Sequence, residues 1–146
     1  MKRIILMLAL CAVFLCGCQT TGSSGASSYS EEFSKAQEIR IASAEDPDDI
    51  ETLTDDGAIS DFITELDLES WSLESPPRDA EVLGTFVLSQ EETVKFGETE
   101  PDRELYDICK LYAYRESPYI TMEIEGFGMD FKISDAAAEY LNGYFE

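Results

Sequence analysis

The segment YITMEIEGFGMDFKI, residues 119–133, has the clearest pattern in the chain. Apolar and polar residues alternate before Gly126, and the alternation resumes after it. The apolar members are Ile120, Met122, Ile124, Phe127, Met129, Phe131 and Ile133. A period of two residues places one side of a strand on a core and the other side in water. We therefore expect two antiparallel strands joined by a turn at Gly126.

Further strands precede this hairpin in the chain. Segments 82–90 and 104–115 are rich in β-branched and aromatic residues, and Glu116-Ser117-Pro118 is typical of a turn. Segment 93–96 is expected to be a short strand or a turn-linked extension. Together these segments predict a run of antiparallel strands with no helix between them.

The earlier part of the folded region has a hairpin pattern followed by a helix pattern. Segments 39–42 and 50–54 flank the acidic turn 45–49 and are expected to pair as strands. Asp55 or Asp56 then caps a helix. Its apolar residues have the i, i+3, i+4, i+7 spacing of one buried helix face, and they are Ile59, Phe62, Ile63 and Leu66.

Two shorter stretches complete the folded part. Leu68, Trp71 and Leu73 are expected to cover an edge of the core before Pro76-Pro77 breaks the chain. A short helix follows the last strand. It is capped by Ser134 or Asp135 and stopped by Asn142-Gly143.

This order of elements predicts an α+β fold. We expect a mostly antiparallel β-sheet packed on one main helix, with a short C-terminal helix. A doubly wound parallel sheet is excluded, because the strands after Ala80 follow one another without intervening helices.

The amino-acid composition excludes several classes of catalytic and binding site. The chain of 146 residues has 31 Asp plus Glu, 10 Lys plus Arg and no histidine, for a formal net charge of -21. Catalytic triads, histidine-rich zinc sites and histidine pH switches need an imidazole and are excluded. Nucleic acid is excluded as a partner, because phosphate binding depends on neutralisation by Lys and Arg. We expect no cofactor, since Gly126-Phe127-Gly128 precedes a strand pattern rather than the helix of a phosphate-binding loop.

The amino terminus has the layout of an export signal. Lys2 and Arg3 give it a positive start, and residues 4–15 are 12 consecutive apolar residues, too few to span a bilayer comfortably. The tetrapeptide Leu15-Cys16-Gly17-Cys18 then resembles the lipobox of bacterial lipoproteins, in which the last cysteine receives diacylglycerol. The resemblance implies that Cys18 is the lipidation site and that Leu15, Cys16 and Gly17 end the signal peptide. The alternatives are an ordinary secretory signal cleaved nearby and an uncleaved membrane segment.

The residues after the lipobox have the composition of a linker. Residues 20–30 read TTGSSGASSYS and carry no charge, which predicts a flexible coil spanning about 20 Å. We therefore divide the chain into a signal peptide (1–17), a lipidated cysteine with a flexible Ser/Gly-rich tether (18–37), and a single α+β domain (38–146). Acyl chains on Cys18, palmitate among them, would hold the mature protein on the cell membrane, facing outside the cytoplasm.

Four stretches of the remaining chain resemble small uncharacterised lipoproteins of Gram-positive bacteria: GTFVLSQEET (84–93), LYAY (111–114), YITM (119–122) and YLNGYF (140–145). The resemblance consists of core and turn residues and covers most of the mature chain. It implies a tethered α+β domain on the cell surface. It implies no activity and no site residue outside the lipobox.

Cysteine usage agrees with this division. Cys11 and Cys16 leave with the signal peptide and Cys18 is lipidated, so Cys109 has no partner for an internal disulfide. The strand-like surroundings of Cys109 predict a buried small side chain. A reactive thiol, the alternative, would need a lowered pKa.

A candidate binding face is formed by Tyr106, Tyr112, Tyr114 and Tyr119, which flank one predicted hairpin. Together with neighbouring carboxylates they would suit a basic protein, a cationic peptide or a polyamine. Cross-strand packing of the rings is the alternative that needs no ligand.

Acidic residues supply the last candidates. Residues 45–81 hold 14 acids and one base, but EF-hand spacing fails there, and turns and helix caps account for the aspartates. We therefore predict no metal site, and a looser calcium site stays open among Asp46, Asp48 and Asp49, or at Asp55 and Asp56. No carboxylate pair stands out as catalytic. We expect a non-catalytic envelope lipoprotein that binds a partner, and the alternative is a small carboxylate-dependent hydrolase of envelope polymer.

Overall fold

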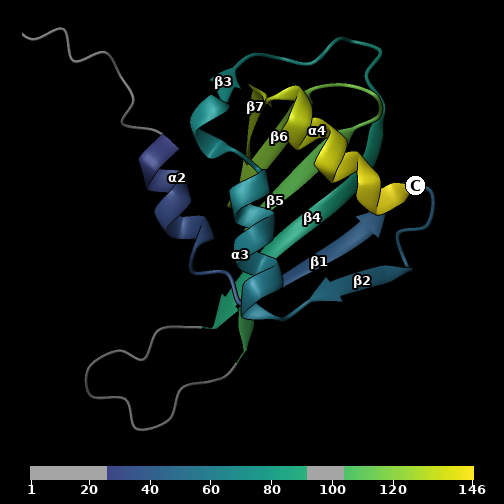
Figure 1. Ribbon diagram of the computed structural model, residues 1–146. Coiled ribbons are helices and arrows are strands. Elements are labelled where there is room, and N and C mark those ends of the chain that lie inside the picture. Colours follow the sequence, from purple (N-terminus) through teal and green to yellow (C-terminus); the bar gives the residue numbers. More distant parts are fainter. Residues whose placement is uncertain (1–25, 92–103) are drawn as a thin grey trace, which may run out of the picture.

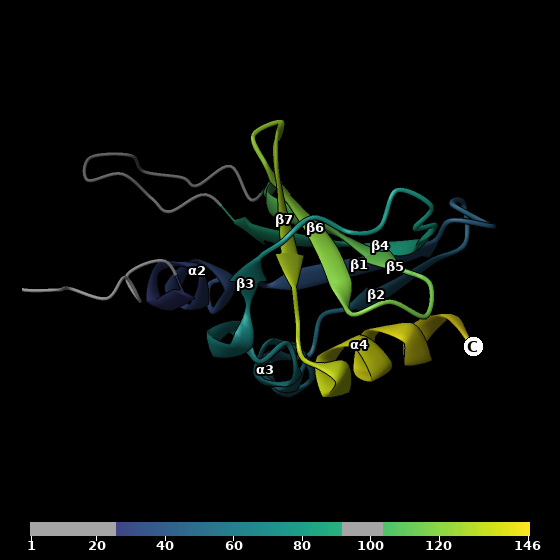
Figure 2. The ribbon, with the colours of Figure 1, turned by 90° about the horizontal axis from the view of Figure 1, so that it is seen from above.

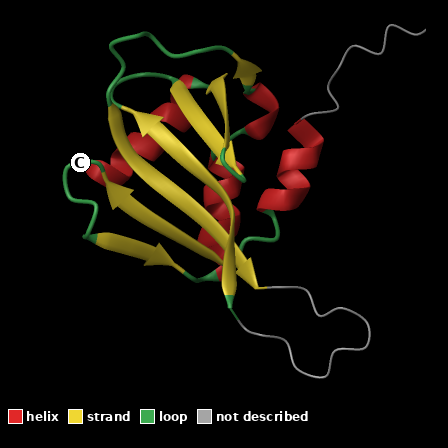
Figure 3. Cartoon of the chain, turned by 180° about the vertical axis from the view of Figure 1, so that it is seen from behind, coloured by secondary structure: helices red, strands yellow, loops and turns green. Residues whose placement is uncertain are grey.

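The computed structural model describes residues 26–91 and 104–146, and it has the predicted α+β fold. Seven antiparallel strands form one sheet in the order β2-β1-β4-β5-β6-β7-β3. The strands are β1 (Glu38–Ser43), β2 (Ile50–Leu53), β3 (Ser72–Leu73), β4 (Val82–Glu91), β5 (Leu105–Tyr114), β6 (Tyr119–Ile124) and β7 (Phe127–Lys132). Figure 1 shows α3 (Asp56–Glu65) and α4 (Asp135–Asn142) in front of this sheet and α2 (Ala26–Phe33) at its side, and Figure 3 shows the sheet from behind with no helix across it.

The hairpin expected around Gly126 is confirmed. β6 and β7 pair from Tyr119 with Lys132 to Ile124 with Phe127, which leaves Glu125 and Gly126 as a two-residue turn. Both turn residues have positive φ, 50° for Glu125 and 84° for Gly126. This is the conformation of a type I′ turn, whose twist matches that of the flanking strands. Gly126 is thus the turn residue best suited to the required backbone.

The predicted main helix is α3 (Asp56–Glu65). Asp55 caps it, because its carboxylate accepts a hydrogen bond from the Ala58 backbone N–H at 3.0 Å. The predicted apolar face is confirmed: Ile59, Phe62 and Leu66 are buried, and Ile63 is half-buried against the core.

The predicted C-terminal helix is α4 (Asp135–Asn142). Ser134 is its cap, since its hydroxyl accepts from the Ala137 N–H at 3.2 Å. Gly143 has a φ of -59° and does not stop the chain in a left-handed conformation. The α-helix nevertheless ends at Asn142 with Gly143 as its C-cap, as predicted, and the chain continues in one further turn, the 3-10 helix η3 (Gly143–Phe145).

The prediction of a flexible tether over residues 18–37 is wrong in its second half. Residues Ala26–Phe33 form a helix, α2, and Phe33 and Ala36 are buried in the core at 0% and 8% exposure. Tyr29 lies one turn before Phe33 and meets Phe131 edge to face, with ring centroids 6.3 Å apart. Burial of these side chains outweighs the serine-rich composition. The folded domain therefore begins before Glu38, and residues 1–25 lie outside the described residues.

Among the described residues, α3 and α4 pack on one face of the sheet, and α2 adds Phe33 to the same core from the side, so the main helix does not cover the core alone. Phe62 of α3 contacts Phe86 of β4 and Tyr140 of α4, with ring centroids 5.2 Å and 6.0 Å apart. Figure 2 shows α3 and α4 on one side of the sheet. One core thus lies between the helices and the sheet.

The connection after α3 is only partly as predicted. Leu68, in the 3-10 helix η2 (Leu68–Ser70), is buried, and Trp71 is half-buried with its Nε1 donating to the Leu66 carbonyl at 2.8 Å. Leu73, however, is 76% exposed and belongs to β3 at the sheet edge, so it does not cover the core. The predicted segment 93–96 lies outside the described residues.

Candidate functional site

The candidate surface is the side of the sheet opposite the helices, which we name the open face. On β5, Cys109, Leu111 and Ala113 are buried in the core. Side chains alternate along a strand, so their neighbours point to the open face. The same alternation along β6 and β7 completes the set, which is Lys110, Tyr112, Tyr114, Tyr119, Thr121, Glu123, Gly128, Asp130 and Lys132. Three of the four predicted tyrosines therefore lie together.

The hydroxyls of these tyrosines are held by neighbouring polar groups. Tyr112 donates to Glu123 Oε2 at 3.2 Å, across the β5–β6 pair. Thr121 donates to Asp130 Oδ1 at 2.7 Å, and the Tyr114 and Thr121 oxygens are 2.8 Å apart. Because Thr121 has a single hydroxyl hydrogen, Tyr114 is the donor to Thr121. The face thus carries a hydrogen-bonded row across three strands.

Tyr119 extends this network to a residue far away in sequence. Its hydroxyl donates to Glu74 Oε1 at 2.6 Å. That hydrogen bond, together with partial burial and the charge of Glu74, raises the pKa of Tyr119. Tyr119 therefore stays a neutral hydrogen-bond donor at physiological pH.

Two lysines lie over the tyrosine rings. Lys110 Nζ is 5.1 Å from the centroid of Tyr112, and Lys132 Nζ is 5.9 Å from that of Tyr119. Both distances are within the range of cation–π attraction. The open face therefore repeats one arrangement, a lysine over a tyrosine whose hydroxyl binds a carboxylate. Within the described residues the ring–ring contacts lie on the helix side, so hydroxyl bonds rather than ring pairing hold these tyrosines.

Tyr106 does not belong to this group. Its neighbour Asp107 accepts from Ser89 Oγ at 2.9 Å and binds Arg40, which places Asp107 on the open face at the far end of β5. Alternation then turns Tyr106 to the other side of the sheet. There its hydroxyl accepts from Gln90 Nε2. The sequence placed all four tyrosines together because a register shift between Leu88 and Ser89 could not be read from it.

Charge is unevenly spread over the molecule. The described residues contain six bases, Lys35, Arg40, Arg78, Lys110, Arg115 and Lys132. Arg40, Lys110 and Lys132 lie on the open face, so half of these bases share it with its acids. The excess negative charge therefore lies mainly on the helix side and in the loops, a distribution that the sequence pattern did not reveal.

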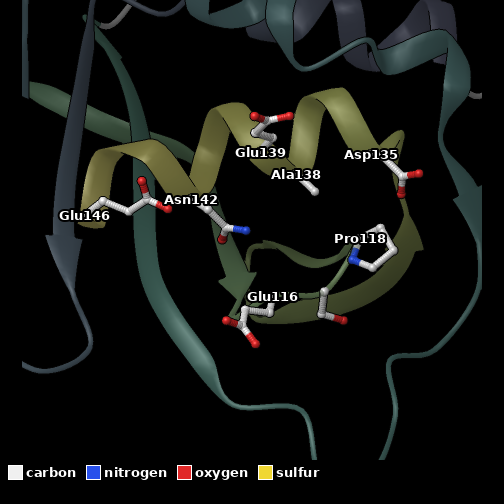
Figure 4. Close-up of a pocket in the computed structure, with 8 residues that line it drawn as sticks. Glu116, Pro118, Asp135, Ala138, Glu139, Asn142 and Glu146 are labelled. Carbon is white, nitrogen blue, oxygen red and sulfur yellow. The ribbon is translucent and has the colours of Figure 1, made fainter.

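A hollow of about 260 Å³ lies between α4 and the β5–β6 turn (Figure 4). Its acidic lining comes from both elements, Glu116 from the turn and Asp135, Glu139 and Glu146 from α4 and beyond. The hydrolase alternative needs converging carboxylates, one of them kept protonated by removal from water. These four carboxylates are all exposed to solvent. Within the described residues, no group of three or more Cys, Asp or Glu is arranged to hold a metal ion.

The cysteine prediction is confirmed for Cys109. It is a free thiol, 3% exposed, and burial raises its pKa to about 12. A thiol held neutral in this way is a poor nucleophile. The lipobox residues Leu15, Cys16, Gly17 and Cys18 lie outside the described residues.

Comparisons with known proteins find no match. No protein-family model matches the chain, and no match is found among the curated proteins or the solved structures. Among the helices in residues 26–91 and 104–146, none has the length and apolar character to cross a membrane.

Proposed function

We propose that this chain is a bacterial envelope lipoprotein, anchored through acyl chains on Cys18, whose folded domain is a non-catalytic binding module. The observation that supports binding is the open face, a sheet surface on which Tyr112, Tyr114 and Tyr119 are held in place by Glu123, Thr121 and Glu74. Tyrosine is enriched where proteins bind one another.

The fixed geometry of the open face favours binding. A side chain that is already hydrogen-bonded loses less conformational entropy when a partner covers it. The half-buried rings of Tyr112, Tyr114 and Tyr119 leave part of each ring accessible between the two lysines. A partner would thus meet an ordered surface of aromatic edges and paired charges.

The net charge indicates the sign of the partner. After loss of the signal peptide the chain keeps 31 acids and 8 bases, a net charge of -23. A net charge of this sign attracts a basic protein or peptide over a long range, and it repels nucleic acid and anionic lipid. We therefore propose a basic protein or peptide at the outer cell surface as the partner.

The anchor is tested by metabolic labelling. Bacteria that produce the full chain are grown with labelled palmitate, and we expect the label on the wild type and on Cys109→Ser but not on Cys18→Ser. The Cys109→Ser variant is the matched control, since it also replaces one thiol by a hydroxyl. Label on Cys18→Ser equal to that on the wild type would overturn the lipid anchor.

The binding face is tested separately. The full chain, in an uncharged detergent, is used to capture proteins from envelope extract, and the captured basic partner is then titrated against variants. Replacing both Tyr112 and Tyr119 by Ala should weaken binding about tenfold or more, the range of interface hot spots. Ser60→Ala, on the exposed side of α3, should bind as the wild type does. Equal affinity of all three proteins would refute the open face as the site.

A further inference from the structure

Helix α4 is flanked by two hollows that meet at Tyr144. One, of about 520 Å³, is lined by Ala136, Glu139, Tyr140, Gly143 and Tyr144. The other, of about 380 Å³, lies between Tyr144, Phe145 and the β1–β2 hairpin, where Asp46 and Asp49 of the loop and Glu51 of β2 line it. In Figure 1 the carboxyl terminus lies beside that loop. We name the two hollows together the α4 groove.

The floor of the α4 groove is aromatic and rigid. The rings of Tyr140 and Tyr144 meet edge to face with centroids 5.4 Å apart, and their hydroxyls are 2.8 Å apart. Buried Phe86 holds both Tyr144 and Phe145, with ring centroids 5.6 Å and 5.4 Å away. The three floor residues are only half-buried, so each leaves ring surface exposed to the groove. An occupant would meet apolar surface that needs no rearrangement.

Every charged side chain that lines the α4 groove is a carboxylate. Glu139 lines the first hollow, and Asp46, Asp49, Glu51 and Glu146 line the second. Asp61 and Glu65 of α3 add to this field, since their charges help to raise the pKa of Tyr140, an effect dominated by burial and by the hydrogen bond with Tyr144. An apolar floor with an acidic rim is complementary to a side chain with an apolar stem and a cationic head.

We propose that the α4 groove binds a cationic segment of a partner protein, in which lysine or arginine alternates with apolar residues. The apolar residues and alkyl stems lie on Tyr140, Tyr144 and Phe145, and the cationic heads reach the carboxylates of the rim. Cation–π contact with the tyrosine rings adds to this attraction. A neutral or anionic segment would cover the same carboxylates without pairing them, which is unfavourable. The inference rests on the proposed function only for the positive charge of the partner.

One substitution in the groove and one outside it allow a matched test. Gly143 has a φ of -59°, and a Cβ built on it meets no atom within 4 Å, so a side chain there enters the groove without strain. Ser30 is an exposed residue of α2, outside both the α4 groove and the open face. Gly143→Lys and Ser30→Lys therefore add the same charge inside and outside the groove.

The probe is a fluorescent peptide of alternating lysine and leucine, titrated by anisotropy against the full chain in uncharged detergent, with empty micelles as the blank. We expect Gly143→Lys to weaken binding about tenfold or more, and Ser30→Lys to leave it within about twofold. A lysine–serine peptide of the same charge and a glutamate–leucine peptide should both bind much more weakly.

Each other result contradicts the groove. Equal loss in Gly143→Lys and Ser30→Lys would mean attraction by net charge alone, and loss only in Ser30→Lys would place the peptide beside α2. Equal binding of the lysine–serine peptide would show that the aromatic floor is unused, and equal binding of the glutamate–leucine peptide that the rim is unused. Absence of wild-type binding would also overturn the proposal, while the palmitate and tyrosine experiments test the proposed function independently.

Discussion

Cys109 and Gly84 both lie on the core side of the sheet, which determines the pKa of the one and the space around the other. Cys109 is on the core side of β5, where the thiol is removed from water and its pKa rises from 9.0 to about 12. Gly84 in β4 is also buried, and a Cβ built there would lie 2.3 Å from the Phe145 ring and 2.8 Å from the Ala42 carbonyl oxygen. Tight packing between the sheet and the elements that cover it thus keeps the Cys109 thiol neutral and leaves no space for a side chain at residue 84.

The raised pKa of Cys109 predicts a specific alkaline destabilisation. In the unfolded chain the thiol ionises above pH 9, whereas in the folded chain it stays neutral up to about pH 12. Its contribution to stability is therefore complete below pH 9 and is lost as the pH rises from 9 toward 12. In urea unfolding of the full chain, the free energy of unfolding should fall more steeply across this range for the wild type than for Cys109→Ala. The difference in slope should approach about 1.4 kcal/mol per pH unit. Parallel curves would contradict the burial of an ionisable thiol.

The packing at Gly84 predicts that even one added methyl group destabilises the fold. Gly84→Ala must displace Phe145 or the β1 backbone at Ala42, so it should lower the free energy of unfolding by about 1–3 kcal/mol. Gly128→Ala is the control, expected to stay within about 0.5 kcal/mol of the wild type. In a Phe145→Ala background the penalty of Gly84→Ala should shrink, since the clash with the ring is then absent. Urea denaturation measures the wild type, the three single variants and the double variant, and an unchanged penalty in that background would exclude the ring as the cause.

The helices and strands that could be predicted from the sequence are those whose signals lie within their own segments. β6 and β7 follow from period-two alternation, and α3 from the Asp55 cap and one apolar face. The partners on the open face depend on pairing between distant segments: Tyr119 and Glu74 are 45 residues apart, and Arg40 and Asp107 are 67 apart. Such pairs require the register of the sheet, which alternation alone does not give.

Helix α2 was missed because its signal is short and amphipathic. In the segment ASSYSEEF, Tyr29 and Phe33 are spaced i, i+4, so one helical face carries both rings, while the three serines of the segment have the composition of a linker. What makes the segment part of the fold is tertiary: Phe33 meets Trp71 edge to face at 6.2 Å and is fully buried. Helices this short gain most of their stability from such packing.

Substitution of Phe33 therefore tests whether residues 26–37 are a packed part of the fold or a flexible tether. Phe33→Ala should lower the free energy of unfolding of the full chain by about 3–5 kcal/mol, the range for removing a buried aromatic side chain. Ser30→Ala, an exposed position of the same helix, should change it by less than about 0.5 kcal/mol. Thermal or urea unfolding distinguishes the two results. If Phe33→Ala unfolded at the same midpoint as Ser30→Ala, residues 26–37 would be a linker after all.

At the scale of the whole molecule, charge is the dominant property. The chain has 31 acids, yet the described residues contain only four ion pairs, which involve Lys35, Arg40 twice, and Arg115. These pairs lie at the surface, with side-chain exposures from 22% for Glu38 to 77% for Glu45, and surface pairs contribute little to stability. Repulsion among the remaining carboxylates of the helix side and the loops is therefore largely uncompensated, which favours encounter with a basic partner and opposes compactness.

This balance predicts that salt stabilises the fold. Raising sodium chloride from about 0.01 M to about 0.15 M shortens the screening length from about 30 Å to about 8 Å. Salt then screens more repulsion than attraction, so the Tm of the full chain should rise, by about 4 °C for each 1 kcal/mol gained. The double variant Asp61→Asn, Glu65→Gln removes two exposed charges of α3 and should show a smaller rise than the wild type. Circular dichroism melts at the two concentrations measure both proteins. A Tm that fell on addition of salt would mean that attraction within the ion pairs outweighs repulsion between carboxylates. The acidic side chains would then be compensated by bases of the same chain and would attract a cationic partner less strongly.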